Sequence, residues 1–199
     1  MMQNRVMSLV MPHRDALVQC VLEGWREYVD LPTERRVHLT RSARAIVVHC
    51  NIIKNLSLTF GMDGPTRVVE FGLLRYLSID GEKFAVGLRA KKLDCNLRTS
   101  NAHTLQQQTL AEQLLMPWAD VETIHAILGY TLTDDEIEPS VSGVWLTQED
   151  QQRVLWSECL WSAAEQAALP TGQRQAERPL PVAVVGPKAR DATNQERIG

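Results

Sequence analysis

The 199-residue sequence lacks the cysteine and histidine spacings that hold metal ions. Its four cysteines, Cys20, Cys50, Cys95 and Cys159, include no CxxC pair, and no HExxH or HxH motif occurs. A zinc site requires such spacings. We therefore expect no metal and no other cofactor, and we expect reduced, unpaired thiols as in a cytoplasmic protein.

Long apolar runs and nucleotide-binding loops are also missing. No apolar segment approaches the roughly 20 residues that a membrane-spanning helix needs. The first residues, MMQNRVMSLVMPHRDA, contain no small-residue cleavage site, so we expect neither a secretory signal nor membrane association. No GxxxxGK(S/T), GxGxxG or GxSxG motif occurs, and nothing therefore supports a phosphate loop, a dinucleotide site or a hydrolase elbow.

The sequence also contains no (D/E)xK motif. Metal-dependent nucleases of the restriction type place an acid two residues before a lysine, so that carboxylates hold the metal ions beside the phosphate. Arg89 stands where that acid would precede Lys91. A two-metal nuclease site is therefore disfavoured.

What the sequence does have is an uneven charge distribution. Residues 1–102 hold 15 Lys/Arg against 10 Asp/Glu, whereas residues 103–165 hold one basic residue against 11 acidic ones. The formal net charge of −3 therefore hides a basic half and an acidic half. Such asymmetry favours a nucleic-acid or charged-protein partner for one half, or mutual neutralisation in a homodimer.

Periodicity predicts two helices followed by strands. Apolar residues at helical spacing predict a helix over residues 14–29, which Pro32 ends. A second helix is expected over residues 40–56, capped by Thr40. Its predicted buried stripe consists of Ala43, Ile46, Val47, Cys50 and Ile53.

A β-hairpin follows, because residues 70–91 alternate around Asp80-Gly81. A two-residue type I′ turn there would pair Leu77 with Phe84. One face is then apolar, and Lys83, Arg89 and Lys91 emerge on the polar face. Arg75 falls on the apolar face, which indicates either a position at the sheet margin or a bulge.

The remaining elements complete an α+β prediction. We expect a helix over residues 103–115, a strand over residues 124–132 and a second hairpin over residues 141–161. The predicted fold is N-terminal helices packed on an antiparallel sheet of four to five strands, with one further helix between the hairpins. A single domain is expected over residues 10–162. Residues 163–199, rich in Ala, Gln, Pro and Gly, are expected to be a disordered tail.

The strongest candidate site is the basic segment after Arg89. Cations and amides there suit contacts to phosphate and sugar, which give affinity without sequence specificity. Arg41, Arg44 and Lys54 would extend this surface if the second helix lay beside it. The predicted nucleic-acid-binding residues are Lys83, Arg89, Lys91, Lys92, Arg98 and Asn101.

His103 is the candidate catalytic residue if the protein is a ribonuclease. A metal-independent ribonuclease needs cations around the scissile phosphate and an acid or base such as histidine. The order of helices before a basic sheet is similar to RelE-like toxins, which is an analogy of fold. His49 borders an apolar helix stripe and is interpreted as structural.

Residues 89–108, RAKKLDCNLRTSNAHTLQQQ, resemble a family of uncharacterised bacterial and phage-encoded proteins, together with residues 128–132 and 153–156. Members carry an RFKKLD-like strand, an N-x-x-T-x-Q-Q element and a later G-Y-x-L strand. Ala90 stands here in place of the family's aromatic residue. The resemblance covers about residues 40–160 and implies a toxin–antitoxin or defence module, because such genes lie beside helix-turn-helix regulators or ImmA/IrrE-like peptidases.

Three hypotheses follow, and the sequence leaves open whether the protein is an enzyme. The first is an accessory or regulatory protein of such a module that contacts nucleic acid through its basic hairpin and loop. The second is a metal-independent ribonuclease toxin. The third is a protein-binding module that docks a basic partner through Asp134, Asp135, Glu136 and Glu138.

Overall fold

The helix predicted over residues 14–29 is helix α2 (Arg14–Val29) of the computed structural model, which describes residues 2–71, 74–99, 121–135, 138–150 and 153–168. Leu17, Val21 and Trp25 recur on one face and are buried, so the periodicity argument is confirmed for this helix. Two short helices precede it, α1 (Met2–Val10) and the 3-10 turn η1 (Met11–His13). The sequence analysis missed α1, although its Val6 and Val10 belong to the core.

Helix α4 (Arg41–Phe60) begins at the predicted cap, where the Thr40 hydroxyl accepts a hydrogen bond from the Ala43 amide at 3.2 Å. It runs past the predicted end at residue 56 and stops at Gly61, whose φ of 74° favours glycine. A four-residue helix, α3 (Thr33–Arg36), connects α2 to α4.

The predicted buried stripe of α4 is wrong in part. Ile46 is 63% exposed and Cys50 is exposed, whereas the fully buried positions are Val48, Ile52, Ile53 and Leu56. The helix is rotated because α2 packs closely on it, with Gly24 against Ile52. This rotation leaves the Ile46 side of the helix free to line a pocket.

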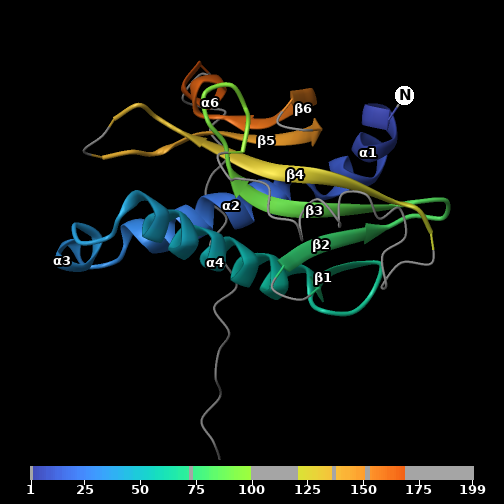
Figure 1. The fold of residues 1–199 in the computed structure, drawn as a ribbon, viewed down its shortest axis with the longest axis horizontal. Coiled ribbons are helices and arrows are strands. Elements are labelled where there is room, and N and C mark those ends of the chain that lie inside the picture. Colours follow the sequence, from blue (N-terminus) through green and yellow to red (C-terminus); the bar gives the residue numbers. More distant parts are fainter. Residues whose placement is uncertain (1, 72–73, 100–120, 136–137, 151–152, 169–199) are drawn as a thin grey trace, which may run out of the picture. The chain divides into compact units, whose positions relative to one another are not determined.

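Six strands form one sheet in the order β1-β2-β3-β4-β5-β6 (Figure 1). The α+β class is therefore confirmed, and the expected four to five strands are too few. The helix predicted over residues 103–115 lies outside the described residues. The strands are β1 (Thr66–Phe71), β2 (Leu74–Asp80), β3 (Ala85–Lys92), β4 (Thr123–Leu132), β5 (Val141–Asp150) and β6 (Arg153–Ser162).

The sheet is mixed, because β3 and β4 pair in parallel and all other neighbours are antiparallel. The expectation of a wholly antiparallel sheet is therefore wrong. Residues 93–122 connect the two strands, and a crossover of a dozen or more residues is what a parallel pair requires. The parallel pair puts Lys92 opposite Tyr130 at the ends of their strands.

The predicted register of the β2–β3 hairpin is also wrong. Leu77 pairs with Leu88 and Ile79 with Val86, so residues 81–84 form the connection instead of Asp80-Gly81. The longer turn lets Phe84 leave the ladder and lie under the Arg5 guanidinium, 4.4 Å from the ring centre. The shift of four residues is even, so each side chain keeps its predicted face.

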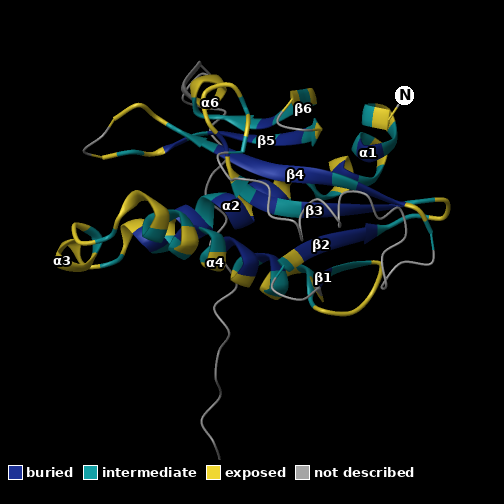
Figure 2. Ribbon diagram, viewed as in Figure 1, coloured by how far each residue is buried: buried dark blue, intermediate teal, exposed yellow. Residues whose placement is uncertain are grey.

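Both faces of the central strands are buried (Figure 2). Leu77, Val86 and Leu88 pack with the helices in the core, as predicted. Tyr76 and Ser78, expected on a solvated face, are 1% and 0% exposed. Arg75 is more than half exposed and pairs with Glu70 at 2.8 Å, which matches the position at the sheet margin.

Residues Met1–Ala168 form one compact unit, which extends beyond the predicted limits of 10–162 at both ends. The first residues of the predicted tail, Ala163–Ala168, form helix α6. The predicted disorder of the rest of that tail concerns residues 169–199, which lie outside the described residues.

Candidate anion-binding pocket

A pocket of about 560 Å³ lies where the N-terminal half of α4 faces the end of β3. Its lining combines cationic, polar and apolar side chains, and none of the described residues that line it is acidic. The lining residues are Arg41, Ser42, Ala45, Ile46, His49, Ala90, Lys91, Lys92, Thr99 and Tyr130.

Helix α4 supplies one wall of the pocket. Arg41, Ala45 and His49 are four residues apart, so they lie on one side of the helix, with Ser42 and Ile46 beside them. The wall therefore changes along the helix from cationic, through apolar, to imidazole.

The opposite wall comes from the end of β3 and from β4. Lys91 and Lys92 are the last residues of β3, and Tyr130 is the β4 partner of Lys92. Tyr130 is buried, and burial raises the pKa of its hydroxyl, which stays protonated as a hydrogen-bonding group.

The loop after β3 closes one side of the pocket. The Asp94 carboxylate accepts hydrogen bonds from the amides of Asn96 and Arg98 at 2.8 and 2.9 Å. Thr99, at the end of the loop, donates its amide and its hydroxyl to the Glu149 carboxylate at 2.6 and 2.8 Å. Two donors to one carboxylate hold Thr99 at the pocket.

The cations at the pocket repel one another. Burial lowers the pKa of Lys92 below its ordinary value, and the charges of Arg44 and Arg41 lower it further. Burial likewise lowers the pKa of Lys91, followed by the charge of Arg89, against an opposing effect of Glu149. The fold thus brings together positive charges that disfavour each other.

His49 lies in this cationic environment as a half-buried imidazole. Burial lowers its pKa, and the charges of Lys91, Arg75 and Arg89 act in the same direction. A hydrogen bond to the backbone of Ala90 has the opposite, smaller effect. At neutral pH the imidazole is therefore uncharged, with one edge held by β3.

The structure brings together some of the predicted nucleic-acid-binding residues and separates others. Lys91 and Lys92 line the pocket, and exposed Arg98 lies on the following loop. Arg89 does not line it and instead hydrogen-bonds to the Tyr76 hydroxyl, within electrostatic range of Lys91 and His49. Asn101 and His103 lie outside the described residues.

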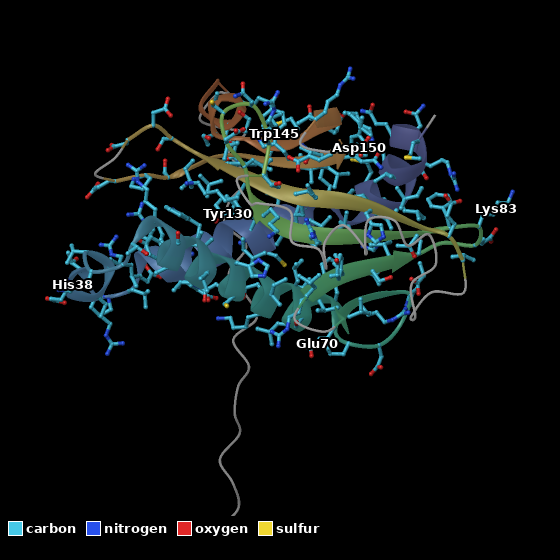
Figure 3. All side chains as sticks on the ribbon, viewed as in Figure 1. His38, Glu70, Lys83, Tyr130, Trp145 and Asp150 are labelled. Atoms are coloured by element: carbon cyan, nitrogen blue, oxygen red, sulfur yellow. The ribbon has the colours of Figure 1, made fainter. Side chains whose placement is uncertain are left out.

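Lys83 lies at the opposite end of the molecule from Tyr130 (Figure 3). It is in the β2–β3 connection, before β3 begins, and Lys91 and Lys92 are the last residues of that strand. Eight residues of strand separate these positions, which corresponds to about 26 Å. Lys83 is therefore not part of the pocket.

The predicted acidic docking residues lie in the β4–β5 connection. Asp134, Asp135 and Glu138 are exposed, and Asp135 accepts a hydrogen bond from the Glu138 amide at 3.0 Å. Glu136 lies outside the described residues. The three described side chains leave a solvated acidic loop available to a partner.

Sequence reasoning missed His49 as a functional candidate. Arg41 and Arg44 were expected to join the basic surface if the helix lay beside it, and they do. Lys54 does not line the pocket and pairs with Glu27 at 2.5 Å. The available signal for His49 was its spacing of eight residues from Arg41, because residues eight apart share a helix face.

No family model, curated protein or solved structure matches this chain. Within the described residues, no group of three His, Cys, Asp or Glu side chains is placed to hold a metal ion. In the same part of the chain, no helix has both the length and the apolar character to cross a membrane.

Proposed function

We propose that this protein binds nucleic acid through phosphate contacts at the pocket between α4 and the end of β3. The role would be that of an accessory or regulatory protein in a bacterial or phage genetic module, as the sequence resemblance implies. Lys91, Lys92 and Arg41 would contact phosphate oxygens, and Arg98 would extend the surface along the adjoining loop.

One observation carries this proposal, namely that cations converge in a concave site without an acidic lining residue among the described ones. Neighbouring arginines oppose the charged form of Lys92, so the empty arrangement is electrostatically unfavourable. An anion placed among them removes the repulsion and forms charge-assisted hydrogen bonds. Phosphate is the anion that nucleic acid presents at every nucleotide.

The dependence of affinity on salt tests the proposal. Each phosphate contact releases condensed counterions, so the logarithm of affinity falls linearly with the logarithm of salt concentration. Replacing Lys91 and Lys92 with alanine should reduce that slope by about 2 on duplex DNA. The matched control is Lys83→Ala, which removes the same charge far from the pocket and should leave most of the slope intact.

The opposite outcome favours the protein-binding hypothesis. If the double variant keeps its fold and the salt slope is unchanged, these lysines do not contact phosphate. If dimerisation or stability changes instead, the cations serve the acidic half of the chain, and a basic partner for Asp134 and Asp135 becomes the better assignment.

A metal-independent ribonuclease is the second candidate function, favoured by the uncharged His49 among phosphate-binding cations. A neutral imidazole can accept the proton of a ribose 2′-hydroxyl as its oxygen attacks phosphorus and the 5′-oxygen leaves. Cleavage of RNA in the presence of EDTA that is lost in His49→Ala would establish it. Loss in His103→Ala but not in His49→Ala would return the assignment to His103.

A further inference from the structure

We infer that the pocket receives one nucleotide unit with a terminal phosphate, either a free nucleotide or the phosphorylated end of a single strand. The inference rests on the proposed function and specifies its ligand. It concerns what enters the pocket, whereas the proposed function requires only that phosphates are contacted.

The size of the pocket supports a single unit. A volume of about 560 Å³ lies within the range of about 300–1,000 Å³ that is typical of sites for small organic ligands. A duplex carries its paired phosphates on the outside of a wide cylinder, which contacts a rim but does not enter a pocket. A chain end or a free nucleotide can enter.

The order of side chains along α4 matches the order of groups in a nucleotide. Arg41 lies at one end of the wall, Ala45 and Ile46 in the middle, and His49 at the other end. Eight residues of helix span about 12 Å. Ile46 is 63% exposed, so an aromatic base placed against it would bury apolar surface that is now in water.

The charge at the cationic end fits a terminal phosphate better than an internal one. A phosphomonoester carries about −1.5 to −2 charges at pH 7, whereas an internal phosphodiester carries one. Lys92 and Arg41 line the pocket, and Arg44 lies close enough to affect Lys92. A doubly charged group balances this cluster more completely.

The imidazole end provides hydrogen bonding without another positive charge. The hydrogen bond to the Ala90 backbone engages one ring nitrogen of His49. The second nitrogen is then the group that meets a base edge or a sugar hydroxyl.

The test compares short single strands that differ only at their ends. Fluorescence anisotropy at fixed salt should show an eight-nucleotide single strand binding about tenfold more tightly with a 5′- or 3′-phosphate than with two hydroxyl ends. Adenosine 5′-monophosphate should compete for the site better than adenosine or inorganic phosphate.

Two substitutions connect the effect to the pocket. Ile46→Glu at an exposed position should remove the preference for the phosphorylated end, whereas Ile46→Gln should retain most of it. Lys92→Met should reduce the preference, with Lys83→Met as the control of matched charge. Circular dichroism establishes that each variant is folded.

Each outcome bears on the inference. Equal affinity for phosphorylated and hydroxyl-ended strands, with salt-dependent binding intact, would overturn it and leave the proposed function standing. Inorganic phosphate competing as well as the nucleotide would also overturn it, because the apolar wall would then contribute nothing. No binding of any strand would overturn both.

Discussion

At the scale of single residues, Lys92 shows how the pocket sets binding against stability. Because its folded-state pKa is lowered, the charged lysine destabilises the fold at neutral pH. We predict that Lys92→Met raises the free energy of unfolding by less than about 1 kcal/mol at low salt, since solvent screens this exposed group.

The measurement is urea denaturation at low and high salt, where the gain from Lys92→Met should shrink as salt screens the repulsion. The same variant should bind nucleic acid more weakly. A variant that is less stable than the parent at low salt would show that Lys92 has a stabilising partner, and the account of an unbalanced cation cluster would fail.

His49 makes a prediction about pH. Its pKa lies below the ordinary value of 6.5, so between the two values the unfolded chain binds the proton and the folded chain does not. The free energy of unfolding should therefore decrease as pH falls through about 6.5 and below. His49→Gln should flatten this part of the stability curve.

The matched control for His49 is the exposed His38, and His38→Gln should keep the slope of the parent. Chemical denaturation at several pH values between 5 and 8 provides the comparison. An unchanged slope in His49→Gln would mean that the imidazole is solvated and not held against β3.

At the scale of elements, the contact between α2 and α4 is the closest in the helical layer. A Cβ atom at Gly24 would lie 2.6 Å from Cγ1 of Ile52 and 2.9 Å from its backbone nitrogen. We predict that Gly24→Ala destabilises the protein by about 1–3 kcal/mol. This loss exceeds the gain of up to about 1 kcal/mol in helix propensity.

Equilibrium unfolding of Gly24→Ala, Ile52→Ala and the double variant checks the helix contact. The cost of alanine at position 24 should be smaller when Ile52 has been shortened, because the two residues touch. A stabilising Gly24→Ala would contradict the close approach of the helices.

The loop that follows β3 depends on Glu149, which accepts both hydrogen bonds from Thr99. Glu149→Ala should destabilise the protein by about 1.5–3 kcal/mol, since hydrogen bonds to charged groups are the stronger ones. Hydrogen exchange at the Thr99 amide should accelerate. The neighbouring Asp150→Ala, at an exposed position, should change the free energy of unfolding by no more than about 0.5 kcal/mol.

These elements also show what the sequence could predict. Periodicity identified α2, β4 and the alternating faces of the β2–β3 hairpin, because each depends on residues close together in the chain. The division of residues 66–80 into two strands and the four-residue turn at residues 81–84 depend on partners elsewhere, among them Arg5 against Phe84.

The candidate site was predictable only in part, for a similar reason. Lys91 and Lys92 stand out as a basic pair, and a pair needs no fold to be noticed. Arg41 and His49 join them only because the sheet places the end of β3 beside the first turns of α4. The rotation of α4 that exposes Ile46 follows from the Gly24 contact, which no local pattern reveals.

At the scale of the whole molecule, the charge asymmetry of the sequence becomes a spatial arrangement. The pocket collects cations from residues 41–92, whereas the exposed acids of the β4–β5 connection belong to the acidic half. No lining residue of the pocket comes from that acidic loop among the described residues. The two regions are therefore separate surfaces that can be tested independently.

The most direct test of the central claim is to locate bound nucleic acid by NMR chemical shifts. During titration with a short 5′-phosphorylated single strand, the account predicts the largest changes at the His49 ring and at the amides of Ser42, Lys92 and Thr99. Signals of Lys83 and Asp134 should stay in place. Changes centred on the β2–β3 or β4–β5 connection, with the His49 ring unaffected, would contradict the assignment of the pocket.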